Sequence, residues 1–220
     1  MKALLYKEFK LAMHPICYVF LFIFPFMTLI PNYPLGIGFI YLLSCYPILF
    51  LGANKGQQSN DLLYSTLLPV RKKDIVLARI ITVIIMQFVY IIVMSALIPL
   101  ALFIRSKTGM DTPGISLDGY VSLLAIVLVG FAICDLIFFP IYYRNGKSIV
   151  LSTLMTILGF VIYLGVFTIV LPLVFEWYKS TLETHLAIQF AFLGGGLVIS
   201  TLIHFLVYKI SSKKLENVDF

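Results

Sequence analysis

Apolar runs long enough to cross a lipid bilayer recur along the whole chain, and they limit its possible folds more than any other feature. A helix needs about 20 apolar residues to cross the ~30 Å hydrocarbon core. Because that core offers no water to backbone N–H and C=O groups, such runs form helices. With 61% hydrophobic and 12% charged residues, the composition does not suit a soluble domain. Six spans are predicted: Ile16–Pro31, Leu35–Leu51, Ile75–Ile104, Leu117–Tyr143, Ser148–Phe175 and His185–Ile210.

The first two predicted spans are short, at or below the usual lower limit of about 17 residues. They form either two full crossings or one shallow hairpin, and the sidedness of the later spans is the same in both cases. Residues 1–220 are therefore predicted to be a single all-α transmembrane domain.

Positive charge predicts the orientation. With the N-terminus in the cytoplasm, only Arg105, Lys107 and Lys179 of the sixteen Lys and Arg residues lie outside. Cytoplasmic loops of membrane proteins carry the excess of these residues, so both termini are predicted to be cytoplasmic. The inner charges are dispersed among short loops, which favours membrane lipid and not nucleic acid as their partner.

The segment 1–14 precedes the first span and has helical periodicity. Lys7 and Lys10 share one helical face, whereas Leu5 and Phe9 share another. This pattern predicts an amphipathic helix in the inner membrane interface. The alternative, that the segment is only the wet end of the first span, stays open.

The segment 54–74 is the one sizeable polar stretch between predicted spans, and a short helix is predicted within it. Asn60 or Asp61 provides the N-cap, and Pro69 ends the helix. The segment either docks on another protein or lies in the interface as a snorkelling loop. The candidate contact residues are Asn60, Asp61, Leu62, Leu63, Tyr64, Ser65, Thr66, Leu67, Leu68, Arg71 and Lys72.

Asp135 is the one acid well inside a predicted span. Such an acid costs several kcal/mol unless it is paired or hydrated, so it is predicted to face the bundle interior. It lies nine residues before Arg144, about 13 Å along a helix, and so in the inner half of the membrane. Its role is either a hydrogen bond to a neighbouring helix, for which Gln87 and Tyr90 are candidates, or a proton or substrate-amine site.

Motifs for catalysis and metal binding are missing. There is no His-Glu-x-x-His and no Gly-x-Ser-x-Gly sequence, and position 141 is Ile where a phosphate-binding loop ending in Gly146-Lys147-Ser148 would need Gly. No enzyme activity, metal or cofactor is therefore predicted in this chain. No second ionisable group is expected near Asp135, because the three histidines lie near predicted membrane surfaces: His14, His185 and His204.

Three stretches carry a family resemblance. Leu67–Arg79 (LLPVRKKDIVLAR) resembles a signature of bacterial ABC exporter permeases of the type-2 class. Leu4–Lys10 (LLYKEFK) is similar to their elbow helix, and Ser211–Phe220 (SSKKLENVDF) is similar to their basic tail. The small size and short outer loops look most like permeases that export amphipathic peptides, such as the phenol-soluble modulin exporters. Lantibiotic and bacitracin self-protection permeases are also similar.

The resemblance implies a multi-pass protein of the bacterial cytoplasmic membrane that works with two copies of an ABC ATPase subunit. ATP and Mg would bind to that partner, and a second permease chain, expected to be identical, would complete the pore. Asn60–Leu68 would be the coupling helix seated on the ATPase, and the cargo would be an amphipathic peptide. Two alternatives stay open: antibiotic efflux by the same machinery, and an ATPase-independent transporter or channel that uses Asp135.

Overall fold

The computed structural model describes residues 2–12, 15–27, 29, 70–108, 120–145, 149–166 and 186–217, and all regular elements in these ranges are helical. The predicted second span, Leu35–Leu51, and positions 54–69 of the polar segment lie outside the described residues. The helices are α1 Lys2–Lys7, the π-helical turn η1 Glu8–Ala12, α2 Pro15–Met27, α5 Lys72–Thr108, α6 Tyr120–Asn145, α7 Ile149–Gly165 and α10 Leu186–Glu216.

Five of the six predicted apolar runs contain a described helix; the run Leu35–Leu51 is not tested. Within the described part of the chain, α5, α6 and α10 are long and apolar enough to cross a membrane, while α2 and α7 contain shorter apolar helices. The long helices extend past the apolar runs into charged residues at one end, where α5 begins at Lys72 and α10 continues to Glu216. The regular elements of the described residues are therefore all helical, with helices that by length and composition could cross a membrane.

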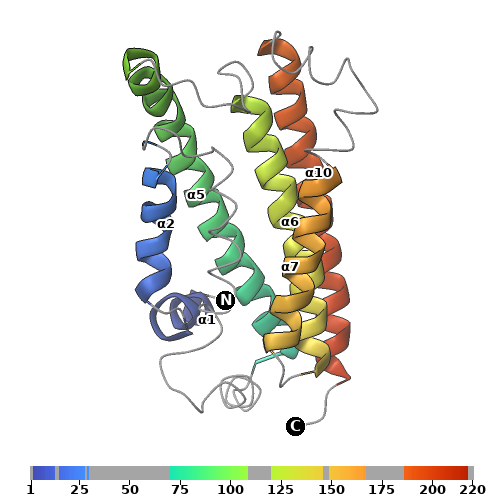
Figure 1. The fold of residues 1–220 in the computed structure, drawn as a ribbon. Coiled ribbons are helices and arrows are strands. Elements are labelled where there is room, and N and C mark those ends of the chain that lie inside the picture. The colour runs from blue at the N-terminus through green and yellow to red at the C-terminus, as the bar shows by residue number, and fades with distance from the viewer. Residues whose placement is uncertain are drawn as a thin grey trace.

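The helices run side by side along the long axis of the molecule (Figure 1). The central helix is α6, which packs along α10 and α7, and α10 also contacts α5. Helix α2 packs on the other side of α5, and α1 with η1 lies across the lower end of α5. The start of α5, the end of α6, the start of α7 and the end of α10 thus meet at one end.

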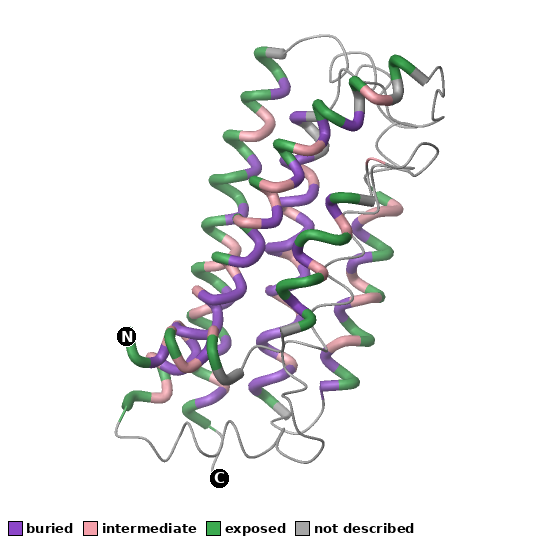
Figure 2. Tube along the Cα trace, turned by 90° about the vertical axis from the view of Figure 1, so that its left-hand side faces the viewer, coloured by how far each residue is buried: buried purple, intermediate pink, exposed green. Residues whose placement is uncertain are grey.

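Buried positions lie along the sides of the helices that face the interior of the bundle (Figure 2). Three phenylalanines of α6 are at most 1% exposed: Phe131, Phe138 and Phe139. Tyr90 of α5 meets the Phe131 ring edge-on, with the ring centroids 5.8 Å apart. In lipid the apolar surroundings offer little driving force for helix association, so close packing of this kind holds such helices together.

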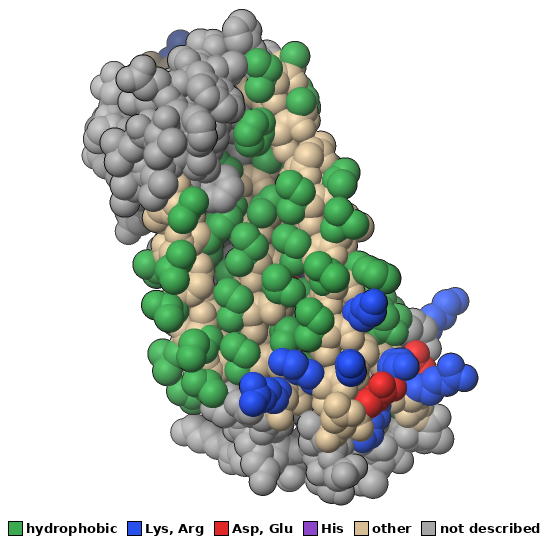
Figure 3. All heavy atoms as spheres, turned by 90° about the vertical axis from the view of Figure 1, so that its right-hand side faces the viewer, with side chains coloured by type: hydrophobic (Ala, Val, Ile, Leu, Met, Phe, Trp, Pro, Cys, Tyr) green, Lys and Arg blue, Asp and Glu red, His purple; other side chains and the backbone are tan. Residues whose placement is uncertain are grey.

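The outward faces of α7 and α10 are apolar, and charge gathers at one end of the molecule. Leu154, Leu158, Val198 and Phe205 are among the exposed apolar side chains on these helices. Figure 3 shows these faces as a broad apolar wall, with Lys and Arg side chains concentrated at its lower end. This separation suits a protein whose wall meets lipid and whose charged end meets water. Which side of the membrane the charged end faces stays a prediction.

Candidate functional site

Most of the predicted ATPase-contact residues, those from Asn60 to Leu68, lie outside the described residues. The structure does describe the two that follow, Arg71 and Lys72. Arg71 is exposed, and its carbonyl oxygen accepts hydrogen bonds from the backbone N–H groups of Asp74 at 2.9 Å and Ile75 at 3.4 Å. Arg71 therefore caps α5, so that the predicted docking segment leads directly into this helix.

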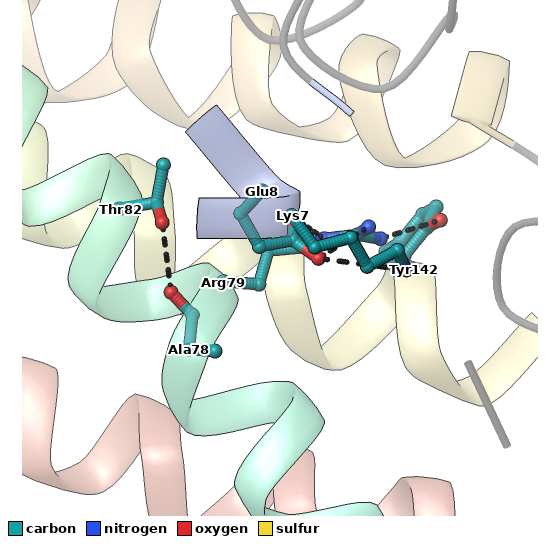
Figure 4. A network of polar contacts seen from close by, with 6 residues as sticks. All are labelled: Lys7, Glu8, Ala78, Arg79, Thr82 and Tyr142. Atoms are coloured by element: carbon teal, nitrogen blue, oxygen red, sulfur yellow. Dashed lines mark hydrogen bonds and ion pairs between the residues drawn. The ribbon is translucent and has the colours of Figure 1, made fainter. Parts of the chain in front are cut away.

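A buried ion pair joins the N-terminal segment to α5 close to that point. The Arg79 guanidinium donates from Nε to Glu8 Oε2 at 2.9 Å and from its second terminal nitrogen to Glu8 Oε1 at 3.2 Å. Its first terminal nitrogen donates to the Tyr142 hydroxyl of α6 at 3.4 Å. Figure 4 shows these three side chains converging, with Lys7 beside them. We call Glu8, Arg79 and Tyr142 the N-terminal clamp.

The clamp is almost closed to solvent, with the Glu8 and Arg79 side chains each 5% exposed. A bidentate Arg–carboxylate pair is among the strongest hydrogen-bonded contacts between side chains. It ties η1, α5 and α6 together at the charged end of the molecule.

The clamp was not predicted from the sequence. The amphipathic pattern placed Leu5 and Phe9 on the apolar face, yet Leu4 and Glu8 are the buried residues of this segment, with Leu5 and Phe9 half-buried. The sequence features that could have indicated the clamp are one acid, Glu8, among the N-terminal lysines and one arginine, Arg79, several residues inside a predicted span. Each is costly to bury alone, and each needs a partner that the sequence does not name.

A second polar cluster lies deeper in the bundle and joins three helices. Gln87 Nε2 of α5 donates to Asp135 Oδ2 of α6 at 2.8 Å. His204 Nε2 of α10 lies 2.9 Å from the same oxygen. Asp135 is fully buried, Gln87 is 6% exposed and the His204 side chain 11% exposed. We call Gln87, Asp135 and His204 the membrane polar cluster.

The expectation that Asp135 has no second ionisable group beside it is wrong. His204 was assigned to a membrane surface from its distance to the end of the sixth predicted span, but the structure brings it against Asp135. The cluster lies well inside the helices: Gln87 comes eight residues after Arg79, about 12 Å along α5. Asp135 and Gln87, singled out from the sequence, are thus in direct contact.

No metal site is found in the part of the chain that the structure describes, where no group of three or more His, Cys, Asp or Glu residues could hold an ion. The membrane polar cluster contains two such residues, Asp135 and His204, whose side chains are in hydrogen-bond contact.

Comparison with known proteins connects these features to a family. Residues 3–216 match the family model described as ABC-2 family transporter protein, so the match includes both polar clusters and the predicted docking segment. No curated protein matches the chain, and no solved structure does so either.

Proposed function

Because this chain belongs to the ABC-2 family of transporter proteins, it is a transmembrane subunit of an ABC transporter, and we propose that it exports amphipathic peptides with energy from a separate ATPase. Two copies of that ATPase and a second, identical permease chain would complete the exporter. ATP and Mg would bind to the ATPase, because the one glycine-lysine-serine sequence here lacks the glycine that a phosphate loop requires.

The observation that carries the coupling proposal is the geometry at the start of α5. The segment Asn60–Leu68, with Arg71 and Lys72 behind it, would be the contact with the ATPase. Helix α5 begins immediately after this segment and continues for 37 residues, about 55 Å, as one helix. A push on the segment would therefore move the start of one continuous helix, and the N-terminal clamp would pass that movement to η1 and α6.

The cargo proposal rests on the apolar character of the described surfaces. A wall of exposed Leu, Val and Phe side chains on α7 and α10 suits an amphipathic peptide that enters sideways from the inner leaflet. Antibiotic peptides of similar character are the alternative cargo. The protein would act in the bacterial cytoplasmic membrane with its charged end toward the ATPase.

The test is co-expression of the chain with an ABC ATPase encoded next to its gene. We expect the two proteins to purify together and an amphipathic helical peptide to stimulate ATP hydrolysis in liposomes. Leu63→Asp or Leu67→Asp is expected to lower this stimulation at least tenfold, because a charge would replace an apolar contact at the proposed interface. Gln57→Asp adds the same charge to the same segment outside the proposed contact and serves as the matched control.

Two results would contradict the proposal. If both leucine variants assemble and respond to peptide as the parent does, Asn60–Leu68 is not the coupling element. If transport continues without the ATPase and is lost in Asp135→Asn, the chain is an ATPase-independent transporter instead.

A further inference from the structure

The hydrogen bonds around the His204 ring determine where its protons lie. Nδ1 is 2.7 Å from the backbone carbonyl oxygen of Ser200 and 3.3 Å from the Ser200 hydroxyl. A carbonyl oxygen only accepts hydrogen bonds, so Nδ1 must carry a hydrogen. The other nitrogen, Nε2, is 2.9 Å from Asp135 Oδ2, and a proton must lie between these two atoms for them to approach so closely.

The amide of Gln87 indicates which partner holds that proton. Gln87 Nε2 also donates to Asp135 Oδ2, so this oxygen is the meeting point of two nitrogen atoms. An ionised carboxylate oxygen accepts two hydrogen bonds readily, and His donates from both nitrogens only as the imidazolium. The arrangement therefore fits an imidazolium–carboxylate pair that is neutral overall, which is the form in which charges are tolerated within a membrane.

Few ionisable groups are identified around the pair within the described residues. Asp135 is the one charged group that faces His204 in the described part of the chain, and Ser200 is its other polar neighbour. Cys134, also buried, is the titratable group beside Asp135 on α6. Helix α5 faces the pair with the uncharged amide of Gln87. Because the imidazolium–carboxylate pair is neutral overall, gain or loss of a single proton changes its net charge by one.

We propose that Asp135 and His204 form a proton-binding site within the membrane, and that the bound proton holds α10 against α5 and α6. With the proton present, the pair and Gln87 tie three helices together through one carboxylate oxygen. When the proton leaves His204, the bare Nε2 lone pair faces the carboxylate, and the contact between α6 and α10 becomes repulsive. This site does not depend on the proposed ATPase or on the peptide cargo.

Nitrogen NMR of the full chain in lipid nanodiscs tests the site directly. In a His14→Gln, His185→Gln background His204 is the one remaining histidine, so ¹⁵N-histidine labelling reports it alone. At neutral pH we expect both ring nitrogens to show a directly bonded hydrogen. A ring with one bare nitrogen, of either tautomer, would overturn the proposal. This measurement keeps Asp135, Gln87 and His204, so the site itself is unaltered.

Substitutions then assign the proton to the pair. In the same background Asp135→Asn is expected to remove the directly bonded hydrogen from one ring nitrogen at neutral pH, because the counter-charge is gone while the side-chain size is kept. Cys134→Ser, at the neighbouring buried position, is the control and should leave both signals unchanged. If Asp135→Asn retains both bonded hydrogens, Asp135 does not hold the proton and the proposed site is wrong.

Discussion

Replacing Glu8 with Gln removes the counter-charge of a guanidinium that is almost completely buried. Two Arg79 N–H groups donate to the Glu8 carboxylate at 2.9 and 3.2 Å, and both side chains are 5% exposed. Removing one partner from a buried ion pair costs about 3–5 kcal/mol, because the remaining charge stays buried without compensation. Gln keeps one acceptor oxygen, and Tyr142 still accepts from Arg79, so the lower end, about 3 kcal/mol, is expected.

The chain offers a matched control at the same charged end. Lys73 Nζ lies 3.2 Å from Glu216 Oε1, a similar separation, but these side chains are 53% and 44% exposed. An exposed pair contributes about 0–1 kcal/mol at most, since water and salt screen it. Glu216→Gln is therefore expected to change the free energy of unfolding by less than about 1 kcal/mol. The two pairs differ in burial and also in geometry, since Arg79 contacts Glu8 through two nitrogens and Lys73 contacts Glu216 through one.

The assay is equilibrium unfolding of the purified chain in mixed micelles by added SDS, followed by far-ultraviolet circular dichroism. A Glu8→Gln, Arg79→Gln double variant should lose less stability than Glu8→Gln alone, because no buried charge is left unpaired. If Glu8→Gln lowers the free energy of unfolding no more than Glu216→Gln does, then Arg79 reaches water and the clamp does not hold the N-terminal segment to α5.

Two further predictions use the same unfolding assay. Gly194→Ala should stabilise the chain by up to about 1 kcal/mol, because a Cβ there has nothing within 4 Å and Ala is the better helix former. Gly196→Ala should not raise the free energy of unfolding in this way, since its Cβ would lie 3.3 Å from the carbonyl oxygen of Ala125. An equal increase at both positions would refute the close packing of α6 against α10. Phe131→Ala, at a side chain 1% exposed, should lower the free energy of unfolding by about 2 kcal/mol, the cost of a cavity of roughly 100 Å³. The transfer of the side chain adds little to this cost, because its alternative surroundings are lipid and not water. Phe205→Ala, at a side chain 62% exposed, should be nearly neutral, and equal losses would show that Phe131 also faces lipid.

The helices were predictable because their cause is local. A run of apolar residues in lipid satisfies its own backbone only as a helix, so Ile75–Ile104 and Leu117–Tyr143 correspond to α5 Lys72–Thr108 and α6 Tyr120–Asn145 within a few residues. The interior position of Asp135 followed from the same reasoning, because an acid in a span must find a partner or water. Composition and spacing along one helix carry both conclusions.

The pairings were decided by the tertiary structure. Glu8 and Arg79 are 71 residues apart and Asp135 and His204 are 69 apart, so no helical periodicity relates either pair. His204 and Glu8 each fit a plausible local role, one as a surface histidine and the other as part of a basic amphipathic segment. The sequence determined that these charges need partners, since burying a charge alone is costly. Only the packing of η1, α5, α6 and α10 decided which partners they have, because that depends on which helix faces meet across the bundle.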